Sequence, residues 1–400
     1  MKFLPYGCQE ITEADIEAVV KILKSDFLTQ GPAIESFEKA FCQATGARFA
    51  IACSNGTAAL HLAAIAAGIA KGDTVLVPPV TFVASANCAR FNGADVVFAD
   101  IDRKNLTMSP EECERQLILA KEKGSPIKAV VTVDFAGHPC DMAAFARLKK
   151  KYDFIWIQDA CHALGATWQD ESGRKWKIGE WPVPDMTVYS FHPVKHITSG
   201  EGGMITTHSE RYAENLRLHR THGITKDPSR FVFSEMALAK DGSINPWYYE
   251  MQSLGFNYRL TDMQAALGES QLKRLDNFIT RRRQIVDQYR KKLSHLQNLE
   301  FPEVKRDVGH AYHLAIIELN FDRIGKERAR VMNELREKGI GTQVHYIPVP
   351  MMPYYAETSC LAELPASMDY YRKALSIPCY PQMTDEDVAR VCKAVEEVIS

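Results

Sequence analysis

Residues 187–207, TVYSFHPVKHITSGEGGMITT, are the most informative part of this chain. Apolar runs at 187–191 and 204–207 predict two short strands. Lys195 stands between them, just before the glycine-rich segment 200–203. Glycines allow close approach of the backbone to another group. Lys195 is therefore expected in a turn between two strands, where a ligand has room to approach.

The sequence around this stretch alternates between short β-rich runs and helical stretches. Further strand candidates lie at 74–77, 96–99, 129–133 and 154–157. Such alternation predicts crossover units and an α/β fold with a largely parallel sheet. Several runs end in polar residues, including Asp134, Asp159 and Ser190. Ligands of parallel sheets bind at the carboxyl ends of the strands, so the chemistry is expected there.

Helical patterns occupy both ends of the chain. Thr12 and Asp15 have the spacing of a capping box before an amphipathic run. After Thr261 one long helical pattern covers 263–296, and its basic second half is interpreted as a solvated face. Strand candidates at 313–319 and 341–346, a helix near 326–338 and a terminal helix after Thr384 predict a smaller α+β region. We expect a large domain, residues 1–262, and a linking helix with a small domain, residues 263–400; the N-terminal segment is a candidate for packing on the small domain.

Composition excludes several classes of protein. The chain has 400 residues, 46% hydrophobic and 24% charged, as in an ordinary globular protein. Its net charge of -2 provides no basic stripe, so no nucleic-acid partner is expected. The ten cysteines are scattered without metal-ligand spacing, which predicts free thiols and no metal site. With no signal-peptide pattern and no apolar run long enough to span a bilayer, we expect a cytoplasmic protein without membrane contact.

Lys195 and Asp159 are the two candidate catalytic residues. A buried lysine amine has a lowered pKa and condenses with an aldehyde, although Lys195 considered alone is more readily explained as a solvated loop residue. Asp159 ends a strand candidate, where its carboxylate can pair with a pyridinium nitrogen or simply cap a helix. Together the two residues favour pyridoxal phosphate as the cofactor. His162 follows closely, but a buried core histidine explains it as well.

Two further motifs suit the same cofactor. Residues 53–60, CSNGTAAL, pass from a small polar loop into an alanine-rich helix whose first N–H groups can hold a phosphate, with Ser190 adding a hydroxyl. Helix capping alone also explains this motif. Phe82, in TFVASAN at 81–87, is either a ring that stacks on the cofactor or a core aromatic.

Taken in order, these motifs resemble those of the PLP-dependent transferases of fold type I, the aspartate aminotransferase-like fold. Within that fold they resemble the DegT/DnrJ/EryC1/StrS family of sugar aminotransferases. The resemblance covers nearly the whole chain, through LTQGP at 28–32, SNGTAALHL at 54–62, QDACHALGA at 158–166, SFHPVKHITSGEGG at 190–203, GFNYRLTDMQAALG at 255–268, HYIPV at 345–349 and LSIPCYP at 375–381. It implies a large, mostly parallel sheet domain plus a small α+β domain.

The resemblance also implies roles for single residues around the cofactor ring. Lys195 would form the Schiff base, and Asp159 would pair with the pyridine nitrogen. Phe82 would stack on the ring, and His162 would lie near its phenolic oxygen.

The phosphate and subunit contacts follow from the same resemblance. Thr57, Ala58 and Ser190 would bind the phosphate. Asn257 would reach the phosphate from a neighbouring subunit, which implies that the active unit is a homodimer.

Within the family, the motifs most resemble the transaminases of pseudaminic acid synthesis. This implies that L-glutamate converts the cofactor to pyridoxamine phosphate, which aminates the C4 ketone of a UDP-linked 2-acetamido-2,6-dideoxy-hexos-4-ulose, with Lys195 moving the proton. The product would be UDP-4-amino-4,6-dideoxy-N-acetyl-β-L-altrosamine. Three alternatives stay open: another nucleotide-linked keto sugar of the perosamine, bacillosamine or aminoarabinose type, a PLP-binding regulator without turnover, and an α/β protein without PLP. Five residues are candidates either for the sugar pocket or for core packing: His138, Trp247, His313, His345 and Tyr346.

Overall fold

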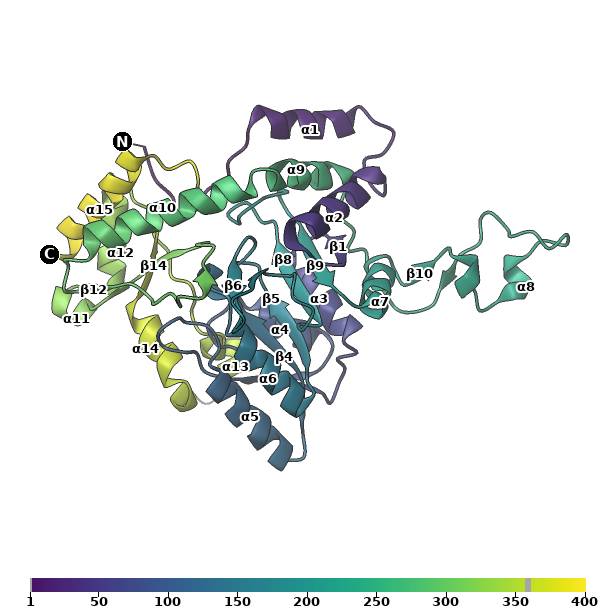
Figure 1. Ribbon diagram of the computed structural model, residues 1–400, viewed down its shortest axis with the longest axis horizontal. Helices are drawn as coiled ribbons and strands as arrows, with labels where there is room; N and C mark the ends of the chain where they lie inside the picture. Colours follow the sequence, from purple (N-terminus) through teal and green to yellow (C-terminus); the bar gives the residue numbers. More distant parts are fainter. Residues whose placement is uncertain (1, 357–360) are drawn as a thin grey trace.

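The computed structural model describes residues 2–356 and 361–400 (Figure 1). At its centre is a seven-stranded sheet in the order β1-β9-β8-β5-β4-β2-β3. Its strands are β1 (Phe49–Cys53), β2 (Thr74–Val77), β3 (Asp95–Phe98), β4 (Ile127–Val133), β5 (Ile155–Asp159), β8 (Met186–Ser190) and β9 (Gly203–Thr207). Within the described sheet, β9 alone runs in the direction opposite to the other six strands. The predicted largely parallel α/β sheet is confirmed.

The sheet is buried on both faces, which explains why its strands are short continuous apolar runs. Successive residues of β4 point to opposite faces. Val130 packs in one hydrophobic cluster, whereas Ala129 and Val131 pack in a second cluster on the other face. Helices cover both faces: α2 (Pro32–Thr45), α3 (Gly56–Ala66), α4 (Ala84–Phe91), α5 (Pro110–Glu122), α6 (Met142–Tyr152), α7 (Glu210–Arg220) and α9 (Asp262–Leu272).

Helix α1 (Glu13–Leu23) begins at the predicted capping box and lies along α9 (Figure 1). The backbone N–H of Thr12 donates to the Asp15 carboxylate at 2.9 Å. The segment before α1 packs on the C-terminal region, because the N–H of Leu4 donates to the carbonyl of Gly339 at 2.9 Å. Leu4 is fully buried in the core of that region.

The C-terminal region has its own small antiparallel sheet, β12 (Leu299–Glu300), β14 (Ala315–Leu319) and β15 (Ala374–Ile377). Its helices are α10 (Leu275–Leu293), α11 (Phe321–Ile324), α12 (Arg328–Glu337), α13 (Pro353–Ala356), α14 (Pro365–Lys373) and α15 (Asp385–Ile399). The predicted helices near 326–338 and after Thr384 are present. The division of the chain at residue 262 stays a prediction.

Two smaller pieces complete the fold. Strands β6 (Thr167–Gln169), β7 (Lys175–Lys177) and β13 (Val308–Gly309) form a three-stranded sheet. Strands β10 (Ile224–Thr225) and β11 (Glu250–Met251), with α8 (Ser234–Ala237), belong to an arm, residues 224–254, that projects from the body (Figure 1). In the described ranges, no helix has both the length and the apolar character needed to cross a bilayer.

Two expectations about the helical stretch after Thr261 were wrong. The single helix is two helices, because the chain turns at residues 273–274 between α9 and α10, where the side chain of Arg274 pairs with Glu10 and Asp15 of the N-terminal segment. The basic second half is also not wholly solvated. Arg282 is 1% exposed, since helical spacing places it on the buried face of α10 with Phe278 and Ile285.

The strand expected at 341–346 is also absent. Gln343 makes only an isolated bridge with Ser376, and the third strand of the small sheet is β15. The segment leaves the sheet because His345 and Tyr346 turn into the cleft described below.

Candidate active site

A cleft of about 920 Å³ lies at the carboxyl ends of β1, β5 and β8. Seven of the eight residues predicted to contact the cofactor line it: Thr57, Ala58, Phe82, Asp159, His162, Ser190 and Lys195. Asn257 does not line it; this residue is exposed and pairs with Thr221 in an isolated bridge. The topology thus gathers residues from four separated motifs, as parallel strands do at one edge of a sheet.

Lys195 follows β8 in a turn whose backbone is closed by its N–H donating to the carbonyl of His192 at 2.9 Å. Burial lowers the pKa of the Lys195 amine, while nearby Cys161 and Asp159 oppose that shift. A lowered pKa increases the fraction of neutral amine, which is the form that attacks a carbonyl carbon.

Asp159 is the last residue of β5. The residue is 5% exposed and lines the cleft. The hydroxyl of Ser85 donates to Oδ2 at 2.7 Å, and the N–H of Cys161 donates to Oδ1 at 3.1 Å. Thr81 in turn hydrogen-bonds the Ser85 hydroxyl at 2.8 Å. These contacts fix the orientation of the carboxylate.

The start of α3 and Ser190 lie on either side of β9, because Cys53 and Ser190 are both register partners of Gly203. A Cβ atom at Gly56 would lie 2.9 Å from Cβ of Ser190, so only glycine fits there. The Asn55 side chain caps the helix by accepting from the N–H of Ala58 at 2.8 Å. The first N–H groups of a helix have no partner within it, so this end of α3 suits an anion.

Three histidines and a tyrosine also line the cleft: His162, His313, His345 and Tyr346. Burial holds the pKa of His162 and of His313 well below the ordinary value and lowers that of His345 to about 3. These imidazoles are therefore neutral at pH 7. The rings of His162 and His313 lie 4.3 Å apart between centroids.

Comparison with known proteins decides the family. The model of the DegT/DnrJ/EryC1/StrS aminotransferase family matches residues 9–396. The chain belongs to this family. Like the rest of the family, this aminotransferase depends on pyridoxal phosphate, so the alternative of an α/β protein without the cofactor is excluded.

Relatives match the aminotransferase over almost their whole length. An uncharacterized protein of Methanocaldococcus jannaschii is 38% identical, with 100% of this chain and 98% of that protein covered. The spore coat polysaccharide biosynthesis protein SpsC of Bacillus subtilis is 37% identical, with 99% and 97% covered. The solved structure of Helicobacter pylori PseC, an aminotransferase in the biosynthesis of pseudoaminic acid, is 27% identical with a TM-score of 0.87, covering 100% and 99% of the two chains.

The cleft of the aminotransferase passes a test of fit for this cofactor. It offers a lysine with a lowered amine pKa, a fixed carboxylate at Asp159 and an open helix end beside the Ser190 hydroxyl. Phe82 is 56% exposed although it lines the cleft, so its ring face is available for stacking. The donor set therefore suits a phosphate, an aromatic ring with a basic nitrogen, and an aldehyde.

Five residues were candidates either for the sugar pocket or for core packing, and the structure shows which of them line the cleft. His313, His345 and Tyr346 line the cleft of the aminotransferase. Trp247 is 72% exposed on the arm, and buried His138 faces away, its Nε2 accepting from the N–H of Lys305 at 3.3 Å.

Sequence reasoning missed Tyr6, which lines the cleft, and Ser85, a buried residue whose hydroxyl donates to the Asp159 carboxylate. Tyr6 lines the cleft because the N-terminal segment passes beside the turn that carries Lys195, and no local pattern signals such a contact. Ser85 lies in the TFVASAN motif, three residues after Phe82. The helical spacing of that motif would have placed both on one side of the turn.

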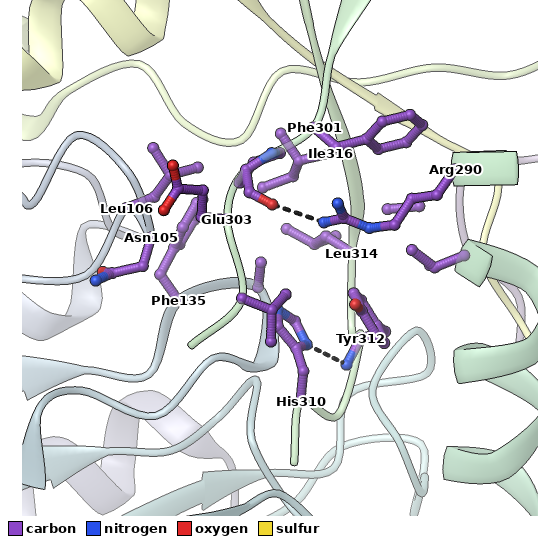
Figure 2. Close-up of a pocket in the computed structure, with 15 residues that line it drawn as sticks. Asn105, Leu106, Phe135, Arg290, Phe301, Glu303, His310, Tyr312, Leu314 and Ile316 are labelled. Atoms are coloured by element: carbon purple, nitrogen blue, oxygen red, sulfur yellow. Dashed lines mark hydrogen bonds between the residues drawn. The ribbon is translucent and has the colours of Figure 1, made fainter. Parts of the chain in front are cut away.

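A second cavity, of about 20 Å³, is lined by none of the predicted site residues (Figure 2). Asn105 and Phe135 line one side, and Arg290 and Phe301 line the other. The guanidinium of Arg290 donates to the carbonyl of Pro302 at 2.6 Å. The cavity has room for about one water molecule and no space for a substrate.

Proposed function

We propose that this aminotransferase transfers the amino group of L-glutamate to the C4 ketone of a UDP-linked 2-acetamido-2,6-dideoxy-hexos-4-ulose. The product would be UDP-4-amino-4,6-dideoxy-N-acetyl-β-L-altrosamine. The observation that carries the proposal is the convergence of Lys195, Asp159 and the start of α3 on one cleft in a chain of this family. The similarity to PseC supports this sugar as the acceptor.

In the proposed mechanism, the residues of the chain bind, orient and move protons. Bound pyridoxal phosphate supplies an electron sink for the carbon that carries the migrating nitrogen. Asp159 holds a negative charge in place for the ring nitrogen, and Phe82 offers its face to the ring. The end of α3, with Thr57, Ala58 and Ser190, binds the phosphate. Lys195 would hold the group through Nζ and, when that amine is free, would move a proton from Cα of glutamate in one half-reaction and to C4 of the sugar in the other.

The active unit in this proposal is a homodimer. Asn257 lies three residues after the end of the arm, and its neighbour Tyr258 lines the cleft of its own copy. Successive residues in extended chain point to opposite sides, so Asn257 faces away from that cleft and is free to serve a second copy. The arm carries large exposed apolar side chains, among them Val232, Phe233, Met236, Trp247 and Leu254, at 64–78% exposure. Such a patch is typical of an interface. The cytoplasmic location also stays a prediction.

A second candidate function is amination of a different nucleotide-linked keto sugar. The similarity to SpsC, a protein of spore coat polysaccharide biosynthesis, favours this alternative, because that relative shares more identity with the chain than PseC does. A non-catalytic regulator is disfavoured because Lys195 and Asp159 are both in place in the cleft.

A substrate panel tests the proposal. The purified holoenzyme is given L-glutamate and, separately, the proposed UDP-linked keto sugar and the keto precursors of perosamine, bacillosamine and aminoarabinose. Formation of 2-oxoglutarate and of amino sugar is measured. We expect the highest kcat/KM with the proposed keto sugar. A higher value with another sugar would support the second candidate. No glutamate-dependent turnover with any of them would support the regulator.

A further inference from the structure

The ring of His162 is held by hydrogen bonds at both of its nitrogen atoms. The backbone N–H of Ala136 donates to Nδ1 at 3.3 Å. The hydroxyl of Tyr346 lies 3.2 Å from Nε2. An N–H group can only donate, so Nδ1 of His162 must carry a lone pair.

This contact determines the tautomer of His162. A neutral imidazole with a lone pair on Nδ1 carries its proton on Nε2. The doubly protonated form is disfavoured, because it would set an Nδ1–H against the N–H of Ala136, and burial together with nearby Lys195 lowers the pKa of His162. Nε2–H therefore donates to the oxygen of Tyr346.

The backbone that directs the Ala136 N–H is rigid. Ala136 has a φ of 58°, an uncommon conformation for a residue with a side chain. Its carbonyl accepts from the N–H of Leu314 at 3.4 Å, and the carbonyl of Gly137 accepts from the N–H of Ala311 at 2.9 Å. Gly137 has a φ of 102°, and a Cβ there would lie 2.7 Å from the Tyr312 nitrogen. The uncommon conformation is thus held from two sides, as in many functional sites.

The consequence falls on Tyr346. Its oxygen already accepts the proton of His162, so its own proton must be directed elsewhere. No other hydrogen bond of this hydroxyl is found among the described residues, and Tyr346 lines the cleft beside Phe82, with ring centroids 6.2 Å apart. Burial raises the pKa of Tyr346, so the hydroxyl keeps its proton.

We propose that the Ala136 N–H and His162 orient Tyr346 as a hydrogen-bond donor to an acceptor oxygen of the ligand in this cleft. His162 and the backbone of Ala136 are positioning groups, and Tyr346 is the group that touches the ligand. The acceptor is an oxygen of the cofactor ring or of the sugar, which share the same chemistry. The proposal rests on this cleft being the active site.

A tautomer measurement tests the orienting step without any turnover. The holoenzyme is labelled with ¹⁵N-histidine, and the His162 signals are assigned by their loss in His162→Asn. We expect His162 as the neutral Nε2–H form between pH 6 and 8. An Nδ1–H form or an imidazolium in that range would overturn the proposal, whether or not the substrate has been identified correctly.

Removal of one oxygen atom tests the donor and identifies its acceptor. Tyr346→Phe removes a single hydrogen bond, which should weaken binding of the ligand that accepts it by about tenfold. Weaker cofactor binding with a shifted absorption band, in the absence of sugar, identifies the cofactor oxygen. A rise in KM for the keto sugar with normal cofactor binding identifies the sugar oxygen. Tyr355→Phe is the matched control, because that hydroxyl donates to Asn87 at 2.7 Å outside the cleft. Equal values for Tyr346→Phe, Tyr355→Phe and the parent enzyme would overturn the proposal.

Discussion

The amine nitrogen of Lys195 lies 3.5 Å from Nε2 of His313 in the wall of the cleft. Burial and the nearby lysine hold the pKa of His313 well below its ordinary value, so the imidazole is neutral. The carbonyl of His313 accepts from the buried guanidinium of Arg282 at 3.1 Å, which fixes the base of this side chain. Nε2 of a neutral His313 is thus held beside the Lys195 amine, which the reaction needs.

His313 is predicted to assist Lys195 whenever the amine is free. His313→Leu should slow the half-reaction with glutamate by about tenfold, because the buried amine loses its hydrogen-bond partner. His313→Gln should recover much of the rate, since an amide can make the same contact. Stopped-flow absorbance of the holoenzyme mixed with glutamate measures both rates. Equal rates for His313→Leu and the parent would show that the contact has no role.

Asp159 is predicted to act through its charge. Asp159→Asn keeps the size of the side chain but removes the carboxylate that Ser85 and the N–H of Cys161 orient. We expect kcat to fall about 100-fold or more, the size of effect seen when an oriented electrostatic partner is removed. Ser85→Ala, which keeps the charge and loses one orienting bond, should lose much less activity. Similar losses in the two variants would contradict a role for the charge.

The arm is predicted to hold two copies together. Leu254 and Trp247 are 78% and 72% exposed, so charged residues there should leave the folded chain intact. Trp247→Asp combined with Leu254→Asp should convert a dimer to a monomer in sedimentation velocity, because interface aromatics carry much of the binding energy. Ile118→Asp, at a residue 41% exposed on α5, is the control and should remain a dimer. A parent enzyme that is monomeric, or a double variant that stays dimeric, would contradict this prediction.

Acid is predicted to destabilise the folded enzyme. Five buried histidines have pKa values well below the ordinary one, with that of His345 lowered to about 3: His162, His196, His310, His313 and His345. In the unfolded chain they take up protons below about pH 6.5. The stability that depends on neutral imidazoles is therefore complete above that pH and is lost as the pH falls.

Asp134 acts in the opposite direction, because burial raises the pKa of its carboxyl to about 7. Its contribution is complete below about pH 4, its unfolded value, and is lost as the pH rises through 7. Five groups outweigh one, so the Tm of the holoenzyme should be at least about 5 °C lower at pH 5 than at pH 7.5. An unchanged or higher Tm at pH 5 would contradict the account.

The elements that the sequence predicted well are those with local signals. The strand at 74–77 and the capping box at Thr12 are seen as predicted, because an apolar run and a cap depend on adjacent residues. The segment 341–346 resembled a strand by composition. Its bridge partner Ser376 and most other residues of the cleft that its side chains enter are distant in sequence, so no local pattern shows that it leaves the sheet. Arg282 has the helical spacing of the buried face, but its charge suggested solvent, and the carbonyls of Tyr312, His313 and Cys379 that accept from it are distant in sequence.

The cleft shows the same limit. Lys195 and Asp159 could be selected from the sequence because Asp159 ends one strand and Lys195 follows another that ends at the same edge of the sheet. The hydrogen bonds that link Ala136, His162 and Tyr346 could not be predicted from the sequence, since they depend on the direction of a backbone N–H and on the orientation of one ring. The place of Tyr6 in the cleft could not be predicted either, because it depends on the packing of the N-terminal segment against the distant C-terminal region.

Lys195 is predicted to hold the cofactor, and reductive trapping shows whether it does. The purified enzyme is loaded with pyridoxal phosphate, treated with borohydride to make the link to the lysine permanent, and digested for peptide mass spectrometry. We predict a phosphopyridoxyl group on the peptide that contains Lys195, and its absence from Lys195→Ala. Specific labelling of a different lysine would contradict the assignment of Lys195. Uptake of as much label by Lys195→Ala as by the parent enzyme would also contradict it.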